Sequence, residues 1–150
     1  MSGVRFAGYA AIFDRPDKGG DVVRSGAFRA TLVRAGEVPL LWQHDPRRVI
    51  GRVEHLSEDN RGLRVIASVA GKREAEAVRA GAVKGLSFGY RVRGARGPDR
   101  NTGLRELIEL DLIEISLVAL PTLTTLAIAR IGEIAVSVRS ITSSISRGIE

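Results

Sequence analysis

The sequence contains no cysteine, and this absence removes several kinds of chemistry at once. Disulfides, thiolate nucleophiles and zinc–thiolate sites all need cysteine, and a chain without it suits a reducing compartment. A P-loop, an H-E-x-x-H motif and an acidic cluster with metal-ligand spacing are missing too. We therefore expect no cofactor and no bound metal.

Long apolar runs are also missing. No stretch of about 18 uncharged apolar residues occurs, and the first residues, MSGVRFAGYAAIF, lack the basic start and apolar core of a signal peptide. These absences predict a soluble, cytoplasmic protein with no membrane partner. A length of 150 residues suits one domain that buries a core without help from disulfides or metals.

Aromatic residues are scarce, at 5% of the chain, whereas basic residues are in excess and give a net charge of +6. Clustered Lys and Arg would indicate nucleic-acid binding, but the arginines here are scattered along the chain and few aromatic rings accompany them. Nucleic acid is therefore not expected as the primary partner. A solvated basic surface, which could also steer an acidic protein partner, is the simpler interpretation.

Alternation of apolar and polar residues predicts a chain made mainly of strands. These strands are predicted over residues 4–13, 38–44, 49–56, 63–69, 86–92 and 104–120, with short helices over 26–35 and 72–82. Loops are expected at 14–21 and 94–103, and a hairpin connection at 58–62. Residues 122–150 show no clean period, so we divide the chain into a domain, 1–121, and a C-terminal tail, 122–150, that packs on it or serves assembly.

Ser87 is the candidate nucleophile, because it is a lone hydroxyl at the start of a strand and has apolar and glycine neighbours. Gly85 and Gly89 flank it, and a residue without Cβ lets a substrate or another backbone approach closely. The letters G-x-S-x-G match the nucleophile elbow of α/β-hydrolases, but that serine occupies a strand-to-helix turn. Here the serine enters a strand, so we treat the match as false.

A serine needs a base, and the chain has only two histidines, His44 and His55. A lone histidine is more often a surface or core residue than a catalyst. His44 has the better setting, because it stands at the end of a predicted strand, just before Asp45-Pro46, where its side chain can reach a neighbouring strand end.

Glu114 interrupts the apolar run from Leu110 to Leu120, and a buried carboxylate must be satisfied by hydrogen bonds or by a charge. A histidine Nδ1–H is one such partner, and it would keep the ring in the tautomer that a serine needs. An arginine pair, or an edge position open to water, would satisfy Glu114 equally well. Spacing alone does not decide, since a Ser-His-acid set has no fixed order in sequence.

Several blocks of the chain, in order, resemble the prohead maturation proteases of HK97-like tailed phages and related gene transfer agents. The blocks are GYAAIF from Gly8, DVVRSGAF from Asp21, LWQHD from Leu41, IGRV from Ile50, GLRV from Gly62, GLSFGY from Gly85 and LIEISLVALP from Leu112. The resemblance implies a fold related to herpesvirus assembly proteases, an antiparallel β-barrel with flanking short helices.

The resemblance also implies a serine endopeptidase that processes the major capsid protein precursor or a scaffold segment, and also itself, inside procapsids in the host or producer-cell cytoplasm. It assigns the histidine to His44 and the serine to Ser87, and it favours Glu114 over His55 as the third member. A homodimer or higher oligomer stays open. So does a different class of function, a non-catalytic assembly factor that binds capsid protein or DNA through its basic surface.

Overall fold

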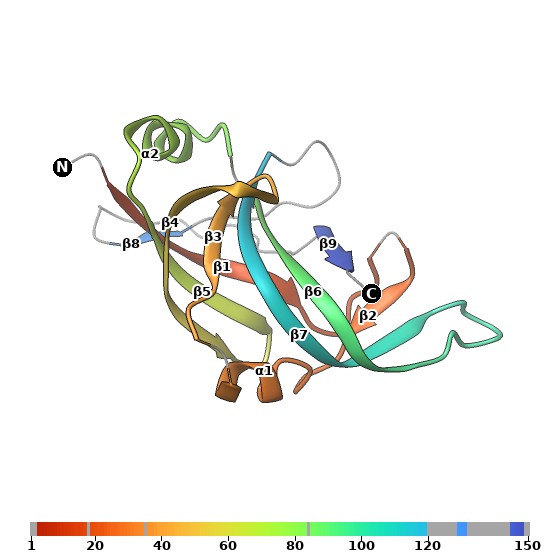
Figure 1. Ribbon diagram of the computed structural model, residues 1–150. Helices are drawn as coiled ribbons and strands as arrows, with labels where there is room; N and C mark the ends of the chain where they lie inside the picture. The colour runs from red at the N-terminus through yellow and green to blue at the C-terminus, as the bar shows by residue number, and fades with distance from the viewer. Residues whose placement is uncertain are drawn as a thin grey trace.

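The computed structural model describes residues 3–17, 19–34, 36–83, 85–119, 129–131 and 145–148. Most of them lie in one sheet that curls into a half-barrel (Figure 1). In chain order the elements are β1 (Val4–Ile12), β2 (Asp21–Val23), α1 (Arg29–Arg34), β3 (Pro39–Trp42), β4 (Asp45–Glu58), β5 (Gly62–Val69), α2 (Lys72–Arg79), β6 (Gly85–Arg96), β7 (Arg105–Val118), β8 (Ala129–Ile131) and β9 (Ile145–Gly148). The mainly β prediction is confirmed.

The strand order in the sheet is β8-β1-β5-β4-β3-β7-β6-β9, and β2 pairs with β7 outside this path. The pairs β1–β5, β5–β4, β4–β3 and β7–β6 are antiparallel, whereas β3 lies parallel to β7. The strand β7 is thus flanked by β3 on one side and by β6 on the other. The strand β3 is thus placed beside the β6–β7 hairpin, which follows it more than 40 residues later in the chain.

The core fills the inside of the curled sheet, and its largest fully buried side chains come from β1, β2, β3, β5, β6, β7 and the turn before α1. Phe28 packs edge-on against Phe88 with ring centroids 5.5 Å apart, and Phe88 packs on Tyr90 at 5.0 Å. Aromatic pairs in this geometry are stabilised beyond the area that they bury. Leu86, Phe88 and Tyr90 therefore anchor β6 from its inner face.

The helix predicted over 26–35 is shorter than expected, because α1 covers Arg29–Arg34. Gly26 has a φ of +93°, which an α-helix does not accommodate. The N–H groups of Gly26 and Phe28 donate to the carboxylate of Glu58 on β4, at 2.8 Å each. A tertiary contact thus sets where this helix begins. The predicted last residue of the helix, Ala35, lies outside the described residues.

Two further predictions need correction. The loop expected at 94–103 is shorter, because Gly94, Ala95 and Arg96 continue the β6–β7 ladder. The loop expected at 14–21 is also shorter, because β2 begins at Asp21. Pairing with a long neighbouring strand outweighs a loop-like composition here. Pro46 lies near the start of β4, where a strand tolerates proline.

The tail predicted at 122–150 contains β8, which pairs with β1, and β9, which lies parallel to β6. The proposed boundary at residue 121 falls outside the described residues. Within the described residues, neither helix has the length and apolar character needed to cross a membrane.

Candidate active site

Ser87 is the third residue of β6, and the strand alternation directs it to the face opposite Leu86 and Phe88. Its Cα partner on β7 is Ser116, and the partner of Gly89 is Glu114. Residues that are two apart in a strand share a face, so Ser87, Gly89, Glu114 and Ser116 lie on one side of the β6–β7 pair. This side carries the polar groups, and the other side carries the core.

His44 lies in the two-residue loop that joins β3 to β4, where Trp42 pairs with Asp45. Gln43 and His44 have φ angles of +52° and +63°. A two-residue hairpin loop with positive φ at both positions normally contains glycine or asparagine, since each larger residue in this region costs about 1–2 kcal/mol. Neither residue here is of that kind, so the loop is strained where the histidine is placed.

Hydrogen bonds from the β7 region hold this strained loop. The N–H of Gln43 donates to the carbonyl of Leu117 at 2.9 Å, and the N–H of His44 donates to the Ser116 hydroxyl at 3.1 Å. The N–H of Ala119 reaches the Gln43 side-chain oxygen at 3.4 Å. Because β3 runs parallel to β7, the loop leaves β3 directly above Ser116 and Leu117.

The imidazole of His44 bridges the other two predicted residues. Its Nε2 lies 2.9 Å from the Ser87 hydroxyl, and its Nδ1 lies 2.5 Å from Oε1 of Glu114. With the ring proton on Nδ1, where Glu114 accepts it, the lone pair of Nε2 faces the serine hydroxyl. The structure thus brings Ser87, His44 and Glu114 together.

Glu114 projects over Gly89, and only glycine leaves room for it. A Cβ built on Gly89 would lie 2.6 Å from Oε1 of Glu114 and 3.1 Å from its Cγ. The side chains of His44 and Glu114 are 8% and 9% exposed. The close approach expected at Gly89 is therefore made by the carboxylate that contacts the histidine ring.

Ser116 is a fourth polar residue of this cluster, and it is not among the site residues predicted from the sequence. Its fully buried hydroxyl donates to Oε2 of Glu114 at 2.5 Å and accepts the N–H of His44. Both oxygens of the Glu114 carboxylate therefore have a hydrogen-bond partner. A signal was present in the sequence, since Glu114 and Ser116 are two polar residues on one face of an apolar strand.

His55 lies away from this cluster. It is an exposed residue of β4, and its Nε2 is 3.1 Å from the Ser57 hydroxyl. Asp45, the carboxylate next to His44 in sequence, is bound by Arg47 through the guanidinium and the backbone N–H, and these bonds hold the pKa of Asp45 below its usual value. The carboxylate that contacts the His44 ring is that of Glu114.

A hydroxyl, an imidazole and a carboxylate in this order can perform nucleophilic catalysis on a carbonyl. The hydroxyl of Ser87 is 0% exposed in this structure. The strand β9 lies along β6, with Ile145 as the Cα partner of Ser87. A substrate therefore reaches the serine only if the packing around β6 opens.

Comparison of the sequence with protein families gives a match to the caudovirus prohead serine proteases over residues 2–141. The prohead protease of Enterobacteria phage HK97 is 31% identical over 94 residues, which cover 58% of this chain and 42% of that protein. The chain thus matches less than half of the length of this relative.

Comparison of the fold gives two herpesvirus proteases. The varicella-zoster virus protease superposes with a TM-score of 0.54 at 14% identity, covering 85% of this chain and 64% of that chain. The KSHV protease in complex with a hexapeptide phosphonate inhibitor gives a TM-score of 0.54 at 13% identity, covering 87% and 66%. At such identities the likeness shows the fold alone, and it confirms the herpesvirus-protease-like prediction.

Proposed function

Because this chain belongs to the caudovirus prohead serine protease family, we propose that it is a serine endopeptidase with Ser87 as nucleophile, His44 as general base and Glu114 as the acid that orients the histidine. The observation that carries this proposal is the continuous contact from the Ser87 hydroxyl through both ring nitrogens of His44 to the Glu114 carboxylate, at 2.9 and 2.5 Å. The three residues come from β6, the β3–β4 loop and β7, so only the folded chain assembles them.

In the proposed reaction the Ser87 oxygen attacks the carbonyl carbon of the scissile peptide bond while Nε2 of His44 takes the hydroxyl proton. The resulting imidazolium is stabilised by Glu114, which keeps its negative charge. His44 then returns the proton to the leaving amine as the C–N bond breaks, and an acyl-enzyme remains on Ser87. Water, deprotonated by His44, attacks the ester, and the acid product leaves with the serine hydroxyl restored.

Ser116 is proposed as a positioning residue in this scheme. Its hydroxyl donates to the oxygen of Glu114 that the imidazole does not use, and it also accepts the backbone N–H of His44. One side chain therefore fixes the acid and the loop of the base with respect to each other. Such preorganisation keeps the histidine aligned without movement of charged groups during the reaction.

The substrate proposed from the family is a capsid protein precursor or scaffold segment, and also the protease itself, processed inside procapsids in the host cytoplasm. Access to Ser87 is then coupled to β9, because this strand lies along β6 opposite the nucleophile. A chain that ends at residue 144 should acylate faster than the whole chain, as followed by the rate of labelling with a fluorophosphonate. An unchanged rate would contradict this coupling.

The test of the proposed function compares the whole chain with Ser87→Ala, using the capsid precursor as substrate and gel mobility as readout. Ser57→Ala is the matched control, because Ser57 also contacts a histidine, His55, outside the cluster. We expect Ser87→Ala to lose cleavage and fluorophosphonate labelling while Ser57→Ala keeps both. Cleavage that survives in Ser87→Ala would overturn the assignment.

The same variants also test the alternative function, a non-catalytic assembly factor that binds capsid protein or DNA through its basic surface. Several surface arginines are bound to carboxylates, among them Arg5 to Glu54 at 2.9 Å and Arg105 to Asp21 at 2.9 Å, so part of the basic charge is neutralised locally. A chain that neither cleaves nor labels, even in assembled particles, but binds capsid protein or salt-sensitively binds DNA would support that function in place of the protease.

A further inference from the structure

A pocket of about 330 Å³ opens directly beside the imidazole, on the face of the sheet that carries the catalytic cluster. His44, Gly89 and Glu114 form the part of its wall that it shares with this cluster. The rest of the wall is apolar and comes from β3, the start of β4 and β7: Pro39, Leu41, Pro46, Val49 and Ile113. An occupant of this pocket therefore lies beside His44.

The chemistry of the wall favours an uncharged occupant. Its ionisable side chains, His44 and Glu114, already bind each other, and Glu114 is also bound by Ser116. A charged group placed here would lose its hydration without gaining a partner of its own. Aliphatic surface is what the remaining wall offers, and burial of an aliphatic side chain in such a place is favourable.

Two branched aliphatic residues of the wall are exposed to solvent. Val49 is 62% exposed and Ile113 is 37% exposed, and they are two of the three large hydrophobic residues that are exposed in the described part of the chain. The third, Val33, is 84% exposed and lies on α1. Exposed apolar side chains that gather in one hollow mark a binding site more often than scattered ones do.

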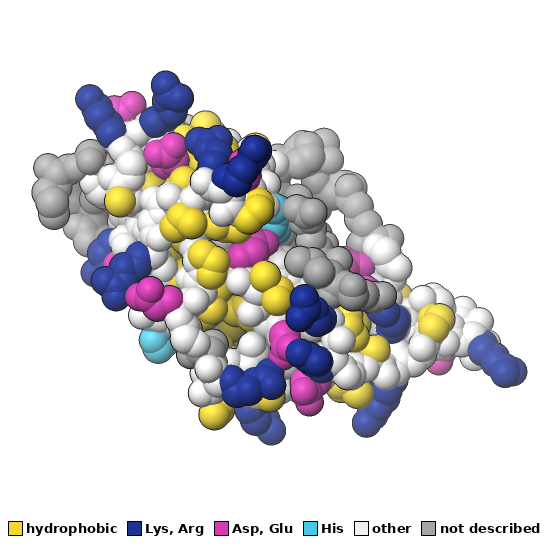
Figure 2. All heavy atoms as spheres, in the orientation of Figure 1, with side chains coloured by type: hydrophobic (Ala, Val, Ile, Leu, Met, Phe, Trp, Pro, Cys, Tyr) yellow, Lys and Arg dark blue, Asp and Glu magenta, His cyan; other side chains and the backbone are white. Residues whose placement is uncertain are grey.

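A β-bulge directs Ile113 to this place. Gly89 pairs with Glu114 and Tyr90 pairs with Leu112, so Ile113 is the extra residue of β7 between these pairs. An extra residue in one strand breaks the alternation and re-aims the side chains beside it, and bulges of this kind are common next to active sites. Figure 2 shows that hydrophobic side chains gather near the middle of this face, while Lys and Arg side chains lie mostly toward its periphery.

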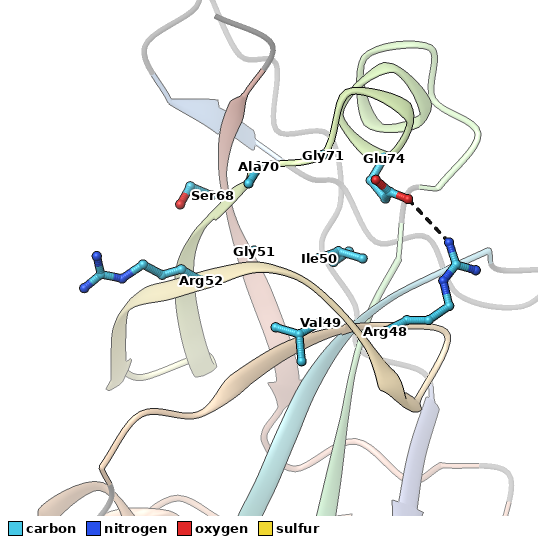
Figure 3. A pocket seen from close by; sticks show the side chains of 9 residues that line it. All are labelled: Arg48, Val49, Ile50, Gly51, Arg52, Ser68, Ala70, Gly71 and Glu74. Atoms are coloured by element: carbon cyan, nitrogen blue, oxygen red, sulfur yellow. Dashed lines mark hydrogen bonds and ion pairs between the residues drawn. The ribbon is translucent and has the colours of Figure 1, made fainter.

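A second hollow, which shares Val49 with the first, lies between β4, β5 and α2 (Figure 3), and its chemistry differs. Its wall includes Arg52 and the ion pair of Arg48 with Glu74, at 3.4 Å. The wall of this hollow contains neither His44 nor Gly89. It is therefore less suited to an aliphatic side chain, and an occupant there would not reach the reacting groups.

We propose that the pocket formed by Leu41, Val49, Ile113 and the His44 imidazole is a specificity subsite for an aliphatic side chain of the peptide substrate. The proposal rests on the proposed function, since it takes Ser87 as the nucleophile. Gly89 follows Ser87 by two residues on β6, roughly 7 Å along the strand at about 3.3 Å per residue. The aliphatic residue therefore lies within about two residues of the scissile bond, because an extended peptide has the same rise.

The test uses fluorogenic peptides that carry the mapped cleavage sequence of the capsid precursor, with Leu, Ala, Lys or Asp at each position within two residues of the scissile bond. At one position Leu should be preferred over Lys. Val49→Asp and Ile113→Asp should lower kcat/KM for the Leu peptide about 10- to 100-fold and shift the preference toward Lys, because they place a carboxylate in the wall. Val33→Asp, the same kind of change outside the pocket, should leave the preference unchanged.

Fluorophosphonate labelling separates failure of this proposal from failure of the proposed function. Normal labelling of Ser87 in Val49→Asp and Ile113→Asp shows that the variants are folded and that the nucleophile is active. If the variants label normally and keep the preference of the unsubstituted chain, the subsite is overturned and the protease stands. If Val49→Asp instead changes only the oligomeric state, the pocket is an interface between copies of the chain, which also overturns the subsite.

Discussion

The strand β4 begins and ends in a hairpin turn, and the two turns are held in different ways. At its start, Gln43 and His44 adopt positive φ without glycine, and the bonds that hold them come from Ser116, Leu117 and Ala119. At its end, the turn has hydrogen bonds within its own residues, and Tyr9 of β1 adds one more. The carboxylate of Asp59 accepts hydrogen bonds from the N–H groups of Arg61 and Gly62, at 2.8 and 3.2 Å. It accepts another hydrogen bond from the Tyr9 hydroxyl.

The difference shows that the backbone strain lies in the turn that contains His44. The turn at Asp59 uses residue types that favour turns, and it can form from local hydrogen bonds. The turn at His44 needs a side chain that glycine does not have, so its backbone conformation is maintained by contacts with residues about seventy positions away. A mutation in the second turn should therefore change stability, whereas a mutation at the first should change catalysis.

The largest expected effect on activity comes from a comparison of two single substitutions, His44→Ala and His55→Ala. His44→Ala should lower kcat/KM by about 10⁴-fold or more, because the serine loses its base. His55→Ala, on β4 near the other turn, should leave activity within about twofold, since His55 is exposed and its ring nitrogen bonds Ser57, away from the cluster. Cleavage kinetics, with circular dichroism to confirm folding, would check both; equal losses would contradict the comparison.

The second-largest effect tests whether catalysis depends on the position of the Glu114 carboxylate beside His44 of the first turn. Gly89→Ala adds a Cβ that would lie 2.6 Å from Oε1 of Glu114, so the carboxylate must move away from the His44 ring. A displacement of this size should lower kcat about 100-fold. Gly94→Ala is the matched control on the same strand, because its Cβ would meet Glu109 at an ordinary 3.5 Å. If both variants have the same kcat, the carboxylate does not act through its position.

Ser116→Ala tests the hydrogen bonds that hold the first turn. It removes one donor to Glu114 and one acceptor of the His44 N–H, so we expect kcat to fall about tenfold with little change in KM. Ser68→Ala is the control, because Ser68 also donates to a glutamate, Glu54, away from the cluster. A shift of the pH–kcat profile in Ser116→Ala alone would identify a positioning role, and unchanged profiles in both would argue against it.

The smallest effect concerns the second turn. Asp59→Ala should lower the free energy of unfolding by about 1–2 kcal/mol at neutral pH, because the Tyr9 hydroxyl and two N–H groups lose their acceptor. Burial raises the pKa of Asp59, but the bonds from Tyr9, Arg61 and Gly62 outweigh it and hold the pKa below its usual value.

The pH dependence of this effect follows from that direction. A carboxylate whose pKa is lowered in the folded state stabilises it above the unfolded pKa of about 3.9, and this contribution is lost as the pH falls through the folded value. The difference between Asp59→Ala and the unsubstituted chain, from urea unfolding, should therefore be full at pH 7 and shrink below about pH 4. A difference that grows in acid would contradict this account, and kcat per folded molecule should not change.

Much of the fold follows from patterns that are local in the chain. Alternation predicts β1, β3, β5 and β7 to within a few residues, the turn residues at 58–62 predict the β4–β5 hairpin, and helical spacing predicts α2. The start of α1 was not predictable in this way, since Glu58 of a distant strand binds the turn before it. The three-residue strand β2 was missed because its pairing with β7 leaves no pattern of its own.

The sequence by itself determined the candidates for the site. One serine between glycines, two histidines and one acid in an apolar strand were all visible, since each is a break in a local pattern. Only the tertiary structure decided that Ser87, His44 and Glu114 meet and that His55 does not join them. Their meeting depends on the register of β6 and β3 against β7, and register is set by packing of side chains that are distant in sequence. The positive φ of His44, the bulge at Ile113 and the role of Ser116 have the same origin, because each exists only when β7 is in place.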